Sequence, residues 1–229
     1  MRIGIIGAGN IGGTLTRRLR ALGHDVSVAN SRGPETLAGL ARETGARPVT
    51  VKEAARAGEM VIVTIPMKNV KDLPADLFKG TFENVVIVDT CNYYPRQRDG
   101  RIDAIENGTA ESRWVSNQFD RPVVKAFNSI YAEHLLEYGR PSGSDGRIAL
   151  PVAGDDRKAK EVVMQLIDEI GFDALDAGSL DESWRQQPGT PVYCTDLDAD
   201  GVRRGLAEAK RERPAKFRAT AGSPAKARR

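Results

Sequence analysis

Short apolar runs alternate along this chain with segments in which apolar residues recur every three or four positions. The apolar runs occupy residues 2–6, 25–29, 60–65 and 85–89. Strands of this length that are apolar on successive residues are typical of a parallel sheet covered on both faces. The segments between them, such as 11–22 and 34–44, have the period of amphipathic helices. The pattern therefore predicts alternating strands and helices.

The alternation continues through the second half of the chain. There we expect strands at 122–126, 148–153 and 172–175 and long helices at 129–138, 155–170 and 197–213. In the first half we also expect short helices at 52–57 and 70–78. This succession predicts an α/β fold with a doubly wound, mostly parallel Rossmann-like sheet. We expect a single domain with extra C-terminal strands. Because strands continue to Leu175, we expect no all-helical substrate domain after the sheet.

The first strand leads directly into a glycine-rich turn and a helix. The turn is Gly7-x-Gly9-x-x-Gly12, with Asn10 and Ile11 between the last two glycines. In a dinucleotide site the first glycine permits the tight turn, the second lets a pyrophosphate approach, and the third lets the helix pack closely. The helix that follows directs its free N–H groups toward the phosphates. We therefore predict that Gly7, Gly9, Asn10, Ile11 and Gly12 bind a pyrophosphate.

The end of the second strand indicates which dinucleotide binds. NAD sites usually have Asp or Glu here for the ribose 2′-OH, whereas this chain has Asn30, Ser31 and Arg32. A hydroxyl and a guanidinium suit a 2′-phosphate, so we predict NADP(H). The alternative is that Ser31 and Arg32 only begin a solvated helix with Pro34 in its first turn. Glu35 would weaken the prediction if its carboxylate faced the same phosphate.

The ends of the other strands complete the predicted cofactor site. Ligands of open α/β sheets bind beyond the carboxyl ends of the strands, where the strand order reverses. We therefore expect Thr64, Ile65 and Pro66 to flank the cofactor. The nicotinamide is expected near Asn92, Ala126 and Asn128, where either asparagine would hold its carboxamide. The alternative is that these asparagines bond only to nearby backbone groups.

The catalytic group is left unassigned by the sequence, and His134 and Asn128 are its candidates. His134 follows the sixth strand and would donate a proton to a reduced substrate, although a structural surface histidine is the simpler interpretation. Cys91 ends a strand, and a packing role is favoured because no partner base is apparent. Tyr93, Tyr94, Tyr193 and Trp184 lie in expected loops and are candidates for a ring platform or a dimer contact.

Composition narrows the class of protein. The chain has 229 residues, 40% of them hydrophobic, and only two cysteines. No apolar run approaches the roughly 18 residues that span a bilayer, and two distant cysteines exclude a disulfide framework or a metal cluster. We expect a cytoplasmic protein without a signal peptide, a membrane partner or a metal. The Asp-rich segment 196–201 resembles the start of an EF-hand, but Ala207 occupies the position of the bidentate glutamate. Thr195 and Asp198 are instead expected to form a capping box.

Basic character is concentrated at the carboxyl end. Residues 203–229 hold ten Lys or Arg and two Glu, a charge of +8, whereas the whole chain carries +3. The remainder therefore carries −5. The basic end has no aromatic interleaving and no nucleic-acid motif, so we expect no nucleic-acid partner. We predict an NADP-binding Rossmann-like domain over 1–195, a C-terminal helix over 196–213 and a basic, disordered tail over 214–229.

These motifs together resemble the deazaflavin-dependent NADP oxidoreductase family. The resemblance rests on the segments at 7–12, 30–37, 61–66, 123–128, 153–156 and 171–180, and covers about residues 1–195. Members of that family pass a hydride between NADPH and an 8-hydroxy-5-deazaflavin. The resemblance implies that residues 7–12 bind pyrophosphate and that Ser31 and Arg32 bind the 2′-phosphate.

Three functions remain open at this stage. The first is hydride transfer between NADPH and a deazaflavin or flavin, which requires stacking but no strong acid or base. The second is NADPH-dependent reduction of a small carbonyl or imine substrate, which requires a proton donor such as His134 or a tyrosine. The third is an NADP(H)-binding sensor without turnover. We expect a homodimer with a small-molecule or cofactor substrate, because the missing substrate domain leaves the ring site open.

Overall fold

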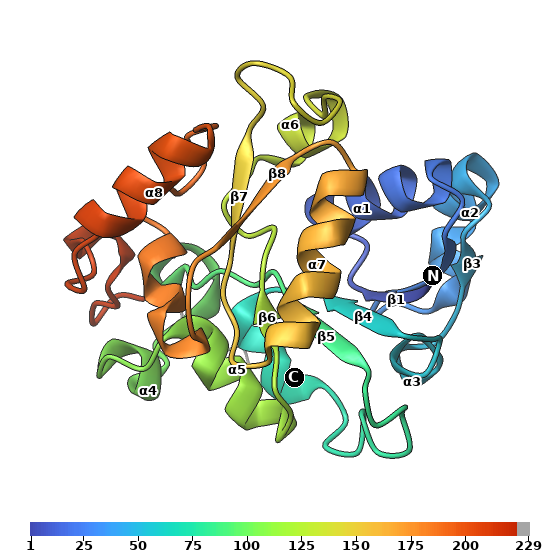
Figure 1. The fold of residues 1–229 in the computed structure, drawn as a ribbon. Helices are drawn as coiled ribbons and strands as arrows, with labels where there is room; N and C mark the ends of the chain where they lie inside the picture. The colour runs from blue at the N-terminus through green and yellow to red at the C-terminus, as the bar shows by residue number, and fades with distance from the viewer. Residues whose placement is uncertain (224–229) are drawn as a thin grey trace.

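A six-stranded parallel sheet forms the centre of the molecule in the computed structural model, which describes residues 1–223 (Figure 1). Its strand order is β3-β2-β1-β4-β5-β6. The order reverses between β1 and β4, which is the switch point of a doubly wound sheet. The predicted Rossmann-like fold is therefore confirmed. The strands are β1 (Arg2–Ile6), β2 (Asp25–Ala29), β3 (Arg47–Pro48), β4 (Met60–Val63), β5 (Val86–Asp89) and β6 (Val124–Lys125).

Helices cover both faces of this sheet because its strands are apolar on both sides. Along β4, Met60 and Ile62 pack in one hydrophobic cluster, and Val61 and Val63 pack in the other. Residues of α1 and α7 belong to the first cluster, and residues of α3 and α5 belong to the second. The helices are α1 (Asn10–Ala21), α2 (Ala38–Thr44), α3 (Val51–Ala55), α4 (Asp103–Glu106), α5 (Glu111–Phe119), α6 (Ala132–Glu137), α7 (Arg157–Glu169) and α8 (Ala199–Glu208). Within residues 1–223, none combines the length and the apolar character needed to cross a bilayer.

The two extra C-terminal strands form a small sheet of their own. β7 (Ala149–Val152) pairs in parallel with β8 (Asp173–Asp176), and Figure 1 shows this pair between α7 and α8. Its link to the large sheet is one antiparallel bridge, in which the backbone of Ala153 exchanges hydrogen bonds of 2.7 and 3.1 Å with Lys125. β6 is only two residues long, so it offers little edge for further pairing.

The carboxyl end differs from the expectation of a helix up to residue 213. α8 ends at Glu208, and Ala209 has an extended ψ of 137°. The extended chain lets Arg213 reach back to Glu111, with which it forms a 2.8 Å ion pair. Of the tail that we expected to be disordered, residues 224–229 lie outside the described residues. Residues 214–223 are described, and they include a short helical turn, Ala215–Phe217.

Three other local expectations need correction. The segment 70–78 is not a helix of its own, because a short turn over Met67–Asp72 ends before Pro74. The helix α5 was not expected at all. The capping box at Thr195 and Asp198 is also wrong in register, because Asp198 is itself the N-cap residue of α8 and accepts a 2.7 Å hydrogen bond from the Gly201 N–H.

Candidate cofactor site

The glycine turn after β1 has the geometry that its sequence predicts. Gly7 has a φ of 111°, and a methyl group on it would overlap the Thr64 carbonyl. A methyl group on Gly12 would overlap the Gly7 carbonyl, so this glycine allows α1 to lie close to the strand. A side chain on Gly9 would instead point into open space. That empty space in front of the loop is where a pyrophosphate would approach the backbone.

The N-terminus of α1 is suited to an anion. Its N-cap is Gly9, no side chain caps the helix, and its first turn has no acidic residue. The first N–H groups of a helix have no intrahelical partner, and the helix dipole gives this end a partial positive charge. Asn10 is exposed and Ile11 is half-buried at this end. The residues therefore fit a dinucleotide pyrophosphate.

A cleft of about 480 Å³ opens in front of this turn. It brings together three of the predicted segments, namely the glycine turn, the end of β2 and the end of β4. The lining residues that the sequence predicted are Gly7, Gly9, Asn30, Ser31, Arg32, Thr64, Ile65 and Pro66. Asn10 lies on an adjoining groove that shares Ala8, Gly9 and Arg32 with the cleft.

The end of β2 contributes hydrogen-bond donors to the cleft and no carboxylate. Asn30 holds the turn, because its Oδ1 accepts a 2.8 Å hydrogen bond from the Arg32 N–H and its Nδ2 donates to Thr36 Oγ1 at 2.8 Å. Ser31 and Arg32 are exposed, and the Arg32 side chain has no ion-pair partner within residues 1–223. The carboxylate of Glu35 lies against Gly33 and is not part of the cleft lining. The arrangement favours a dinucleotide that carries a phosphate on its ribose 2′ position.

Sequence reasoning missed the wall of the cleft opposite the glycine turn. This wall consists of Val51 at the start of α3 and the segment after β4, from which Asn69, Asp72, Leu73 and Pro74 line the cleft. Apolar side chains there suit the flat face of an adenine ring. Residues 69–74 follow the end of β4, and they could have been predicted as cleft residues because ligands of such sheets bind at strand ends.

The two asparagines predicted for the nicotinamide bond to protein groups. The Asn128 amide donates to the Gln186 carbonyl at 2.7 Å and accepts from the Gln186 amide at 3.0 Å. Asn128 and Ala126 are buried, with exposed fractions of 3% and 0%. Asn92 is half-buried and donates to the Asn128 carbonyl at 2.9 Å. The geometry gives Asn128 a structural role, and it does not place Ala126, Asn92 or Asn128 in the cleft lining.

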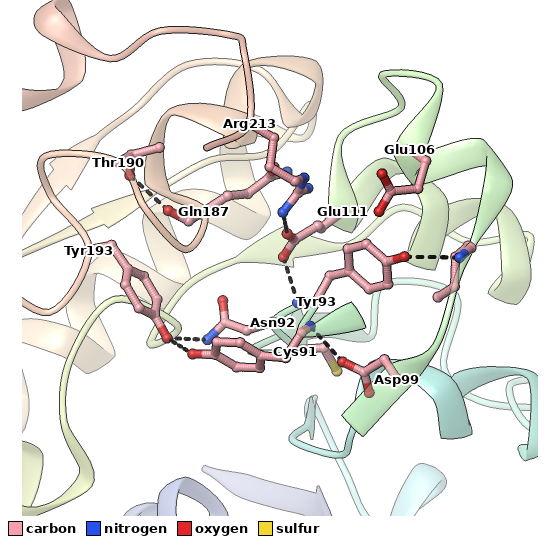
Figure 2. A network of polar contacts seen from close by, with 12 residues as sticks. Cys91, Asn92, Tyr93, Asp99, Glu106, Glu111, Gln187, Thr190, Tyr193 and Arg213 are labelled. Atoms are coloured by element: carbon pink, nitrogen blue, oxygen red, sulfur yellow. Dashed lines mark hydrogen bonds and ion pairs between the residues drawn. The ribbon is translucent and has the colours of Figure 1, made fainter. Parts of the chain in front are cut away.

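A pair of tyrosines lies beside Asn92 at the end of β5. The hydroxyls of Tyr94 and Tyr193 contact each other directly, and Asn92 Nδ2 donates to the Tyr193 hydroxyl at 3.3 Å (Figure 2). Burial raises the pKa of both phenols, so both are protonated at neutral pH. A contact between two hydroxyls uses one proton, and the other proton remains available for a further acceptor.

Buried charges hold the chain that carries these tyrosines. Asp89 is fully buried, and its carboxylate accepts hydrogen bonds from Ser112 Oγ at 2.6 Å and from the Cys91 N–H at 2.9 Å. Lys125, also fully buried, donates to the Cys91 carbonyl and lies 3.5 Å from Asp89. Each buried charge thus has a partner of opposite polarity. Because these charges also bond to the N–H and the carbonyl of Cys91, they hold the turn after β5 in place.

Glu111, at the start of α5, also holds the chain that follows β5. Its carboxylate is fully buried, accepts a 3.1 Å hydrogen bond from the Tyr93 N–H and forms the ion pair with Arg213 (Figure 2). Burial raises the pKa of Glu111, against the opposing effect of Arg213. This role could not be predicted from the sequence, since Glu111 and Arg213 are far apart along the chain.

The structure does not bring His134 to the cleft. The groove beside α1 is lined by Ala132, Glu133 and Leu136 of α6. His134 lies on another face of α6, where its Nδ1 is 2.6 Å from Asp196 and its ring stacks on Tyr138 at 4.5 Å. This position favours the structural interpretation of the histidine, and its role as a proton donor stays a prediction. Cys91 is 2% exposed, and burial raises the pKa of its thiol well above the usual range, which agrees with a packing role.

The strand order and the glycine-turn cleft together define a Rossmann-like fold of the dinucleotide-binding type. Residues 2–93 match the family model described as NADP oxidoreductase, coenzyme F420-dependent. This N-terminal segment is therefore similar to the F420-dependent NADP oxidoreductase family. The matched segment contains the whole cleft lining. The family resemblance expected from the sequence is confirmed.

Known relatives cover different parts of the chain. A hypothetical protein of Sinorhizobium meliloti is 30% identical, with a TM-score of 0.75, and the match covers 87% of this chain and 97% of that one. Protein YjhV of Escherichia coli (strain K12) is 47% identical over 78 residues, a segment that spans 34% of this chain and 57% of YjhV. A protein of Arthrobacter sp. FB24, named as a candidate F420-dependent NADP-reductase, shares the fold at a TM-score of 0.64 and 23% identity, with 79% and 86% of the two chains covered.

Proposed function

We propose that this chain is an NADP(H)-dependent oxidoreductase that transfers a hydride between NADPH and a deazaflavin- or flavin-type acceptor. The match of residues 2–93 to the model of an NADP oxidoreductase family supports the oxidoreductase class. The cleft in front of the glycine turn supports a dinucleotide, because it combines open space at Gly9 with the uncapped N-terminus of α1. When bound, NADPH supplies the hydride.

The observation that carries the preference for NADP(H) is the end of β2. Ser31 and Arg32 line the cleft there, and Arg32 has no ion-pair partner among residues 1–223. A hydroxyl and an unpaired guanidinium bind a 2′-phosphate well, whereas a ribose 2′-OH is usually recognised by Asp or Glu. Thr64, Ile65 and Pro66 would hold the cofactor from the β4 side.

The site has no acid–base dyad in the cleft lining, which suits a ring-to-ring acceptor. Stacking two flat rings places the donor and acceptor carbons together, and this positioning accounts for much of the rate of a hydride transfer. In this reaction the protein would bind and orient the two rings and exclude water from them, and no strong acid or base is required.

A second candidate function has one specific observation in its favour. Reduction of a small carbonyl or imine requires a proton for the product oxygen or nitrogen. The Tyr94–Tyr193 pair supplies a protonated hydroxyl at the end of β5, where the sheet topology directs the nicotinamide. A Tyr193→Phe variant removes one hydroxyl of the pair while it keeps the ring.

The test is NADPH oxidation, followed by the absorbance of the reduced nicotinamide. The acceptors are an oxidised deazaflavin, free flavins and a panel of small aldehydes, ketones and cyclic imines, with NADH as the control donor. Oxidation with deazaflavin or flavin, unchanged in Tyr193→Phe, supports the first function. Oxidation with a carbonyl or imine that falls strongly in Tyr193→Phe supports the second. Tight NADPH binding without turnover on any acceptor would refute both and favour a sensor.

We also propose that the active form is a homodimer. Residues 1–223 include no helical substrate domain, so the ring side of the cleft would gain a wall from a second copy. Light scattering on the purified full chain measures the mass directly, and a fully active monomer would contradict the proposal.

A further inference from the structure

A second cavity, of about 410 Å³, lies beneath the C-terminal segment, by which we mean residues 210–218. It shares no lining residue with the cofactor cleft. Its other walls are the region from α4 to the start of α5 and the segment 184–190. The inference drawn from this cavity goes beyond the proposed function and does not depend on it.

The C-terminal segment is fastened at several points, so the cavity is a built feature. Arg213 pairs with buried Glu111 at 2.8 Å. Arg96 donates to the Ala215 carbonyl at 2.7 Å, and the Ala219 N–H donates to Glu106 at 2.9 Å. Arg96, Glu106 and Glu111 thus hold the C-terminal segment and the adjoining Ala219 over the cavity.

Positive charge predominates around the cavity. The charged residues of its lining are Arg101, Lys210, Arg211, Arg213 and Arg218 against Glu106 and Glu212. Arg101, Arg213 and Arg218 have carboxylate partners, at 2.7, 2.8 and 3.0 Å. In the part of the chain that the structure describes, Lys210 and Arg211 have none. A concave surface with an excess of cations attracts a small anion.

A buried amide in the lining lacks a hydrogen-bond acceptor. Gln187 is 7% exposed, and its Oε1 accepts a 3.0 Å hydrogen bond from Arg213 (Figure 2). A guanidinium only donates, so Arg213 fixes the orientation of the amide. Gln187 Nε2 is then left without a partner among residues 1–223. A buried donor without an acceptor is unfavourable, and an oxygen of a ligand in the cavity would satisfy it.

The remaining lining is apolar and includes Ile105, Trp184, Pro188 and Pro214. An aromatic face and two proline rings suit the body of an organic molecule better than a bare inorganic ion. We propose that this cavity binds a small organic anion, whose carboxylate or phosphate oxygens meet Gln187 Nε2 and the cations of the C-terminal segment. The volume is within the range of about 300–1,000 Å³ that is usual for small-molecule sites.

The experiment titrates the full chain with benzoate and with phenyl phosphate by calorimetry, with and without NADP⁺. Benzoate and phenyl phosphate distinguish the two oxyanion groups. We expect saturable binding of at least one probe, unaffected by NADP⁺, and a shift of the Trp184 indole resonance. Gln187→Leu removes the buried donor and should weaken binding about tenfold. Arg211→Ala should weaken it about threefold, as expected for an exposed charge.

Arg204→Ala is the matched control, because Arg204 is an exposed arginine of α8 that lies outside the cavity lining. It should leave the affinity unchanged. Equal weakening in Arg204→Ala and Arg211→Ala would mean a diffuse charge effect and would overturn the proposal. So would displacement of the probe by NADP⁺, full affinity in Gln187→Leu, or no saturable binding of either probe. A protein that fails to bind NADP⁺ but still binds the probe at this cavity would contradict the proposed function alone.

Discussion

Removal of the Arg32 guanidinium should convert the protein from a preference for NADPH to near indifference between NADPH and NADH. The backbone turn does not depend on this side chain, because Asn30 holds it through the Arg32 N–H and through Thr36. Arg32→Ala should therefore leave the fold and the glycine turn intact. What it removes is a charged donor without another partner in the described chain.

The size of the effect follows from the exposure of Arg32. A hydrogen bond to a charged group contributes about 1.5–3 kcal/mol, and solvent screening at an exposed position favours the lower part of that range. A loss of about 1.5–2 kcal/mol corresponds to roughly a 10- to 30-fold rise in the Kd for NADPH. The Kd for NADH should change by less than about twofold, since NADH has no 2′-phosphate to lose.

The assay is fluorescence titration of each reduced cofactor at low and high salt. The wild-type affinity for NADPH should fall with salt more steeply than that of Arg32→Ala, because the variant lacks the cation. Arg42→Ala, on the exposed side of α2, is the matched control for a lost surface charge. Equal losses of NADPH and NADH affinity in Arg32→Ala, or an Arg42→Ala variant with the same selective loss, would refute the assignment of the 2′-phosphate to Arg32.

Three further predictions concern stability and the roles of single residues. Gly9→Ala should keep its melting temperature within a few degrees, because its Cβ meets no atom, yet lose NADPH binding in a calorimetric titration; Gly12→Ala should instead unfold more easily, because its Cβ overlaps the Gly7 carbonyl. His134→Ala should leave turnover unchanged and cost about 0.5–1 kcal/mol in urea unfolding, as expected for a partly exposed ion pair with Asp196. Glu111 has a raised pKa in the folded state, so its contribution to stability is fully present below its unfolded pKa of about 4.3 and is lost as the pH rises through the folded pKa. In Glu111→Gln this decline of the unfolding free energy with pH should be absent from denaturant titrations, and an unchanged pH profile would show that Glu111 is not its cause.

Local patterns were sufficient to predict the half of the site that is contiguous in sequence. The strand, the glycine turn and α1 are adjacent along the chain, and neighbouring backbone atoms require glycine at Gly7 and Gly12. The end of β2 was predictable for the same reason, since one strand places Asn30, Ser31 and Arg32 at the sheet edge.

Long-range contacts account for what the sequence could not predict. Tyr94 and Tyr193 are 99 positions apart, and Glu111 and Arg213 are 102 positions apart. The helix α5 was not expected because its buried face includes Glu111, Ser112 and Ser116, which look like surface residues in the sequence. Glu111 accepts a hydrogen bond from the Tyr93 N–H, Ser112 donates to Asp89, and Ser116 donates to the Arg121 carbonyl. A period of apolar residues cannot reveal a helix whose inner face is polar for such a reason.

The early end of α8 also results from a long-range contact, the ion pair between Glu111 and Arg213. A helix continuing to residue 213 would carry Arg213 away along the α8 axis, and buried Glu111 would then lack its cation. Leaving a buried carboxylate unpaired costs about 3–5 kcal/mol, whereas the last turn of an exposed helix contributes far less. The extended chain after Glu208 is therefore favoured, and it brings Arg213 to Glu111 at the start of α5. The ion pair between buried Glu111 and Arg213 thus helps to hold the chain after α8 against the region from α4 to the start of α5.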